Sequence, residues 1–105
     1  MPLDIQVEQV PPTVNVYVRG EVDLYSSPDL RNALLKAVAQ ARDGVIVHLE
    51  GVVYMDSSGV ATLVEGLKAN ADQSQSFVLK NPSQAVSKVL ALSRLDRVFQ
   101  IERDA

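Results

Sequence analysis

The residues whose types and spacing are best suited to chemistry are Asp56, Ser57 and Ser58. Apolar residues recur at helical spacing from Val60 to Leu67, which predicts an amphipathic helix that begins at this polar stretch. The first N–H groups of a helix lack intrahelical partners, and the helix dipole is positive at that end. A negative group added to a serine there would be tolerated, which suits regulated phosphorylation. The same residue types also cap helices, and the turn taken alone favours a cap.

The rest of the chain shows no combination of residues typical of a catalytic site. A nucleophilic Ser57 would need an activating base, and no histidine or lysine is signalled near it. His48 is the single histidine and lies in an apolar run typical of a strand, which favours a hydrogen-bonded structural role. Asp56 without neighbouring ligand residues does not make a metal site. The sequence therefore predicts a protein that is not an enzyme and that needs no metal or cofactor.

Length, composition and charge limit the number of domains, the classes of partner and the location of the protein. A chain of 105 residues with 47% hydrophobic residues suits one domain, residues 1–105, with a packed core. The formal net charge is -3 and the ten basic residues are scattered singly, which argues against binding to nucleic acid. No apolar run is long enough for a membrane span and no secretion signal is present, so we expect no membrane insertion. The lack of cysteine fits a cytoplasmic location.

The first half of the chain has the pattern of a hairpin, a helix and a buried strand. Alternating apolar residues on both sides of Pro11-Pro12 predict an antiparallel hairpin. Ser27-Pro28-Asp29 is typical of the start of a helix. Residues 45–49 are apolar nearly throughout, which predicts a central strand covered on both faces.

The second half repeats the alternation of helix and strand. A helix is predicted from Ser57 to about Asn70, followed by a short strand at residues 76–79. Asn81-Pro82 indicates an N-cap and first residue of another helix. Residues 98–101 fit either a peripheral strand or the start of a further helix.

This alternation predicts an α/β fold in which parallel strands are joined by right-handed crossovers. In such sheets the loops at the carboxyl ends of the strands form the functional edge. Asp23 follows the second predicted strand and Ser57 follows the third. We therefore expect these two residues to lie on the same edge of the sheet.

Two motifs at this spacing give the chain a family resemblance. The run Gly-Glu-Val-Asp at residues 20–23, followed by Met-Asp-Ser-Ser-Gly-Val at residues 55–60, resembles the STAS domain family and most closely its anti-sigma factor antagonists. The similarity covers nearly the whole chain, including residues 92–99. It implies a single α/β domain with a mixed sheet of about 4–5 strands and helices packed mainly on one face.

The resemblance also implies a mechanism. In this family an anti-sigma factor that is itself a serine kinase phosphorylates the first serine after the motif aspartate, which is Ser57 here. The unphosphorylated antagonist captures the anti-sigma factor, phosphorylation breaks the complex, and a separate phosphatase restores it. The residues predicted to contact the partner are Asp23, Tyr25, Asp56, Ser58, Gly59 and Val60.

Several of these residues have a second, structural interpretation. Asp23 fits a loop carboxylate that caps its own turn as well as it fits a partner contact. Ser58 is better interpreted as a residue that bonds to the local backbone than as a second phosphorylation site. Tyr25 and Tyr54 fit interface anchors, but ordinary half-buried aromatics are the favoured interpretation.

A second function is compatible with the same motifs. Some STAS proteins are small cytoplasmic subunits of lipid-transporting ABC systems and bind the ATPase of the transporter. Val60-Ala61 after the glycine fits either function, and the sequence does not separate them well. The chain contains no nucleotide-binding motif, so nucleotide binding by the domain itself is less favoured than either of these two functions.

Overall fold

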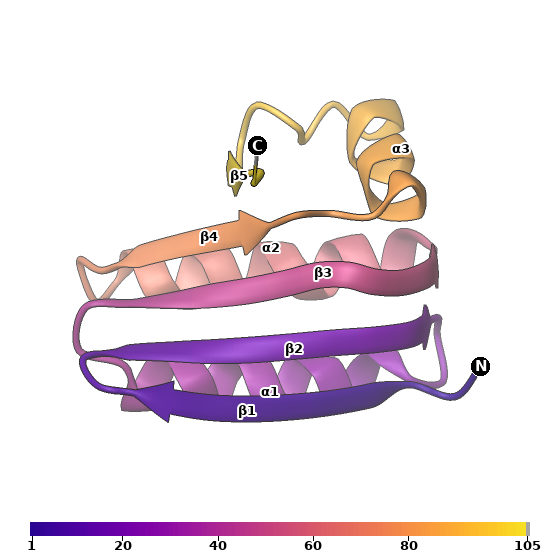
Figure 1. Ribbon diagram of the computed structural model, residues 1–105. Helices are drawn as coiled ribbons and strands as arrows, with labels where there is room; N and C mark the ends of the chain where they lie inside the picture. Colours follow the sequence, from indigo (N-terminus) through magenta and orange to yellow (C-terminus); the bar gives the residue numbers. More distant parts are fainter. Residues whose placement is uncertain (105) are drawn as a thin grey trace.

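Five strands form one mixed sheet within residues 1–104, the part of the chain that this computed structural model describes. The sheet order is β1-β2-β3-β4-β5, so neighbouring strands in the sheet are also consecutive strands in the sequence. Three helices connect the later strands, as Figure 1 shows. The elements are β1 (Asp4–Val10), β2 (Thr13–Val22), α1 (Ser27–Gln40), β3 (Gly44–Met55), α2 (Ser57–Ala71), β4 (Ser76–Lys80), α3 (Gln84–Leu92) and β5 (Gln100–Glu102).

Strand direction puts the functional loops at one edge. β1 and β2 pair antiparallel across the Pro11-Pro12 turn, which confirms the predicted hairpin. β2, β3, β4 and β5 then pair in parallel. Parallel strands joined by helices end at the same side of a sheet, so the carboxyl ends of β2 and β3 meet there. Their last residues, Val22 and Met55, are direct partners in the register.

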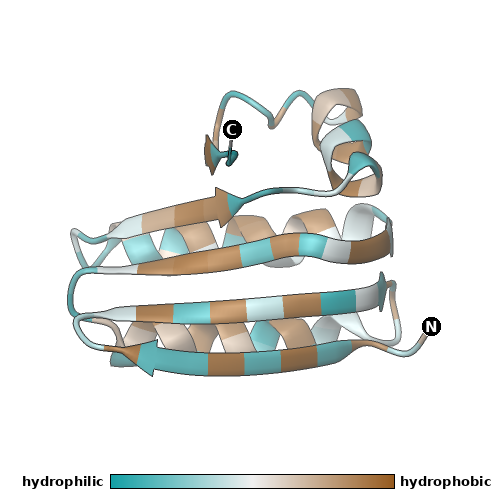
Figure 2. Cartoon of the chain, viewed as in Figure 1, coloured by the Kyte–Doolittle hydropathy of each residue, from teal (hydrophilic) through white to brown (hydrophobic). Residues whose placement is uncertain are grey.

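The core lies between the sheet and helices α1 and α2, which cover the same face of the sheet in Figure 1. Along β2 the side chains of Val14, Val16 and Val18 point into this core and alternate with polar residues, a pattern visible in Figure 2. The prediction of helices mainly on one face is confirmed. The same packing explains the glycine inside α2, because a Cβ atom at Gly66 would lie 2.9 Å from Cζ of Phe77.

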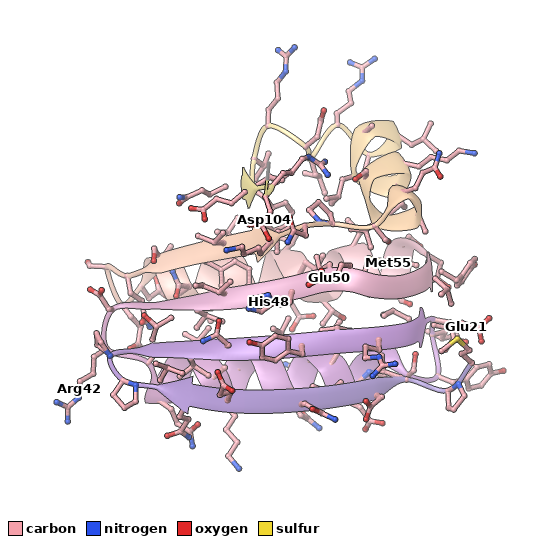
Figure 3. The ribbon with its side chains drawn as sticks, in the orientation of Figure 1. Glu21, Arg42, His48, Glu50, Met55 and Asp104 are labelled. Carbon is pink, nitrogen blue, oxygen red and sulfur yellow. The ribbon has the colours of Figure 1, made fainter. Side chains whose placement is uncertain are left out.

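The opposite face of β3 has no such cover, so the prediction of a central strand buried on both faces is wrong. Val45, Val47 and Leu49 are fully buried, whereas Ile46 and His48, which alternate with them, are only partly buried. His48 points to the open face in Figure 3, stacks on Tyr17 with ring centroids 4.2 Å apart, and has Nε2 2.8 Å from Oδ1 of Asn15. His48 is thus a hydrogen-bonded structural histidine, as predicted. An apolar run alone does not distinguish burial on two faces from burial on one.

Burial lowers the pKa of His48 below its usual value of 6.5, with Glu50 opposing the shift. The unfolded chain then binds more protons than the folded chain as the pH falls below 6.5, so acidification destabilises the fold. We expect the free energy of unfolding to fall between pH 7.5 and pH 5.5 by more in the wild type than in His48→Gln, measured by urea denaturation. Because the chain has one histidine, the difference between the two proteins isolates its contribution. Equal pH dependence of both proteins would contradict this assignment.

The C-terminal part differs from the prediction at the start of its helix. The N-cap of α3 is Ser83, whose hydroxyl accepts a hydrogen bond from the N–H of Val86 at 3.2 Å, and not Asn81. Asn81 has a φ of 49° and its amide bonds instead to Asp104, donating to Oδ2 at 2.9 Å and accepting from the backbone N–H at 2.8 Å. Residues 81–83 therefore form a short connection, and α3 begins later than predicted, at Gln84. Of the two alternatives for residues 98–101, the strand is correct for Gln100 and Ile101, which pair with β4, whereas Val98 and Phe99 lie in the preceding turn.

Candidate functional site

The candidate site is the edge of the sheet where β2 and β3 end. The N–H of Asp56 donates to the carbonyl of Val22 at 3.2 Å, which ties the start of α2 to the end of β2. Figure 3 shows Glu21 and Met55 at this end of the sheet, with Arg42 at the opposite end. The expected placement of Asp23 and Ser57 on one edge is confirmed, because Asp23 directly follows Val22 and Ser57 lies two residues after Met55, the partner of Val22.

Asp56 is the N-cap of α2. Its Oδ1 accepts a hydrogen bond from the N–H of Ser58 at 2.9 Å and a second, short one from the Ser58 hydroxyl. The carbonyl of Ser58 accepts a further bond from Thr62 Oγ1 at 2.9 Å. The side chains of Asp56 and Ser58 therefore stabilise the first turn of the helix together, in agreement with the local role predicted for Ser58.

Ser57 differs from its neighbour in both exposure and bonding. It is the first residue of α2 and is exposed. None of the side-chain hydrogen bonds found within residues 1–104 uses its hydroxyl, whereas the adjacent Ser58 hydroxyl is bound to Asp56. A free hydroxyl at the positive end of a helix is accessible to a phosphoryl donor, and the helix dipole favours the negative charge that would result.

Asp23 organises the loop between β2 and α1. Its Oδ1 accepts hydrogen bonds from the N–H groups of Tyr25 at 2.9 Å and Ser26 at 3.0 Å. These bonds, led by the one from the Ser26 backbone, hold the pKa of Asp23 below its usual value. Of the two interpretations that the sequence leaves open for Asp23, the structure supports the loop carboxylate directly.

Four apolar side chains surround this edge, and we call them the rim patch: Leu24, Tyr25, Val53 and Tyr54. Their exposed fractions are 69%, 90%, 54% and 49%. The interpretation of Tyr25 as a half-buried aromatic is wrong, because its loop turns it into solvent. Leu24 and Val53 are not predicted as site residues from the sequence. Leu24 carried a usable signal, since a large apolar residue in a short polar loop has no core to enter.

Gly59 and Val60 do not share this exposure. Val60 is 5% exposed, and a Cβ atom at Gly59 would lie 2.6 Å from Cγ of Met55 and 2.9 Å from Cγ1 of Val22. Both residues face the core and set how closely α2 approaches the sheet. Direct partner contact, which the family resemblance implies for them, does not fit this burial. The accessible residues at this edge are the rim patch, Asp23, Asp56, Ser57 and Ser58.

Within residues 1–104 no group of three or more His, Asp or Glu side chains is arranged to hold a metal ion. Over the same residues no helix combines the length and the apolar character that crossing a membrane requires.

Comparisons with known proteins identify the family and the solved structures that this chain resembles. A protein-family model described as "Mlab, STAS domain" matches residues 5–101. The anti-sigma-B factor antagonist of Bacillus subtilis is 31% identical over 101 residues, which cover 96% of this chain and 92% of that protein. The structure of the anti-sigma factor antagonist SpoIIAA in its unphosphorylated form superposes with a TM-score of 0.82 at 26% identity, covering 97% of this chain and 89% of that one. Phosphorylated SpoIIAA of Bacillus gives 0.76 at 25% identity, with 97% and 92% covered.

Proposed function

Because the chain belongs to the STAS domain family, we propose that it is an anti-sigma factor antagonist whose capture of its partner is switched by phosphorylation of Ser57. The observation that carries the proposal is the exposed, unbonded hydroxyl of Ser57 beside a serine whose own hydroxyl is bound to Asp56. The names of the relatives support the function, and SpoIIAA has been solved in both phosphorylation states. The role is that of a binding module and kinase substrate, not of an enzyme.

In the unphosphorylated protein the rim patch would bury its four apolar side chains against the partner. A phosphate on Ser57 adds roughly -1.5 to -2 charges at the same end of the sheet as the rim patch, next to Asp56 in the sequence. The helix terminus offsets part of the repulsion within the domain. A partner packed over the loop has no such compensation, since it meets both the bulk and the charge of the phosphate. The switch is therefore local to the interface.

The partners follow from this scheme. We propose an anti-sigma factor that binds the rim patch and acts as the serine kinase, together with a separate phosphatase that regenerates the Ser57 hydroxyl. The net charge of -3 and the apolar character of the rim patch favour a protein partner over nucleic acid. Because the proposed switch depends on one serine, substitution of that serine tests it directly.

Incubation with the cognate kinase and ATP should add one phosphate to the wild-type protein, measured by intact mass, and peptide mapping should place it on Ser57. Ser57→Ala should gain none. Ser58→Ala is the matched control and should still be phosphorylated, because Ser58 contributes a hydrogen bond to Asp56 and not the acceptor hydroxyl. A phosphate mapped to Ser58 would contradict the assignment. Absence of any kinase activity toward the chain, with copurification of a transporter ATPase, would replace the proposal with the ABC-subunit function.

A further inference from the structure

The loop that carries Leu24 and Tyr25 is closed by a set of hydrogen bonds centred on Asp23. Besides accepting from the backbone of Tyr25 and Ser26, Oδ1 of Asp23 lies 3.2 Å from the Ser26 hydroxyl. An oxygen that already accepts two backbone N–H bonds is committed to its own loop. The lowered pKa of Asp23 has the same origin, since its first cause is the bond with the Ser26 backbone.

Ser26 connects this turn back to the sheet. Its hydroxyl accepts from the N–H of Asp23 at 2.9 Å and lies 3.0 Å from the carbonyl of Glu21 in β2, to which it donates. The backbone N–H of Ser27 then bonds to the carbonyl of Asp23 at 2.8 Å. The loop is thus held at both ends, by the last residues of β2 and by the first turn of α1.

The two residues enclosed by this closed loop are the most exposed members of the rim patch. Leu24 and Tyr25 expose 69% and 90% of their surface, although a large apolar side chain in a free loop would tend to fold back onto the domain. A side chain fixed outward in advance loses little further freedom when a partner covers it. Tyrosine suits such a contact because it combines a large apolar ring with a hydroxyl.

We propose that Asp23 is a positioning residue, which holds Leu24 and Tyr25 outward as the docking element for the kinase that phosphorylates Ser57. The kinase would receive the Tyr25 ring in an apolar surface next to its active site, and Asp23 would act through this ring and not by its own charge. The inference rests on the proposed function of Ser57. It extends that function by naming Leu24 and Tyr25 as the residues that the kinase binds and Asp23 as the residue that orients them.

Steady-state phosphorylation of Ser57 separates this role from a direct charge contact. Asp23→Ala removes the acceptor oxygen and should raise KM for the protein substrate roughly tenfold while kcat stays unchanged, because docking and not chemistry is weakened. Asp23→Asn keeps an acceptor oxygen without the charge and should stay within about twofold of the wild type. If Asp23→Asn is as impaired as Asp23→Ala, the carboxylate charge itself is recognised and the proposal is wrong.

A double-mutant cycle asks whether Asp23 acts through the docking element. In a background of Leu24→Ala with Tyr25→Ala, KM should already be raised roughly tenfold or more, and adding Asp23→Ala should change it less than about twofold. Independent, multiplying effects would instead mean that Asp23 contacts the kinase by itself. The Tm of each variant should be measured alongside, to exclude loss of folding as the cause.

Amide hydrogen exchange tests the positioning without any partner. The N–H groups of Tyr25 and Ser26 should exchange about tenfold faster in Asp23→Ala than in the wild type, and at wild-type rates in Asp23→Asn. Unchanged exchange in Asp23→Ala would overturn the positioning role even if Ser57 is phosphorylated normally. If exchange is faster in Asp23→Ala but no kinase phosphorylates Ser57, Asp23 still positions the loop. In that case the proposed function is rejected, and not the positioning role.

Discussion

Ser57→Glu is expected to bind the anti-sigma factor at least about a hundredfold more weakly than the wild type, while remaining folded. The carboxylate would lie at the exposed start of α2, on the proposed interface, where a docked partner excludes water, and an unpaired charge at such a contact costs about 2–5 kcal/mol. A loss of about 2.8 kcal/mol already corresponds to a hundredfold change in Kd. Ser57→Ala should bind within about threefold of the wild type, because an exposed hydroxyl that makes no hydrogen bond contributes little.

Ser57→Gln is the matched control for this experiment, since glutamine has the shape of glutamate without its charge. Isothermal titration calorimetry of all three variants against the partner, with circular dichroism to confirm folding, would separate charge from bulk. Binding by Ser57→Gln should be intermediate. Undiminished binding by Ser57→Glu would show that the partner does not cover this residue, and the switch would then have to lie elsewhere.

Gly59→Val is expected to destabilise the domain by about 1–3 kcal/mol, the usual cost of inserting extra atoms into a packed core. The first added carbon would meet Met55 Cγ at 2.6 Å and Val22 Cγ1 at 2.9 Å, and both neighbours are buried. For a domain of this size the change should lower Tm by roughly 4–8 °C for each kcal/mol. Because the first turn of α2 must move away from β2, the site should also lose the tie between Asp56 and Val22.

Ala61→Val provides the control for Gly59→Val. Ala61 lies two residues later in the same helix but is exposed, so the new valine changes helix propensity by at most about 0.7 kcal/mol and meets no core atoms. Thermal and urea unfolding of the two variants compares the same introduced side chain on opposite sides of one helix. Equal stability of the two would mean that Gly59 is not needed for close packing.

The central features of the fold and site could be predicted because they depend on local patterns. The helical spacing after Gly59 fixes where α2 begins, and the alternation of strand and helix fixes that Asp23 and Ser57 share an edge. These conclusions need only the period of the apolar residues and the rule that parallel strands end together. They hold in the structure without adjustment.

The features that could not be predicted depend on contacts between segments distant in sequence or on competing local bonds. The apolar run of β3 does not reveal that α1 and α2 both lie on one face. Asn81 has the right residue type for a helix cap, but Asp104, 23 residues away, engages its amide. The exposure of Tyr25 depends on the turn that Asp23 closes, and residue type alone gives no measure of it.

The rim patch has a consequence for how such proteins diverge from one another. Leu24, Tyr25, Val53 and Tyr54 are exposed, and the buried residues that hold the sheet and helices together are a separate set. If the rim patch binds the partner as proposed, partner choice and foldability can evolve largely independently, because substitutions of these exposed residues change the packed core little. Under the proposed function, substitutions at these four positions after gene duplication would change which kinase each copy binds, while every copy keeps the same scaffold and Ser57.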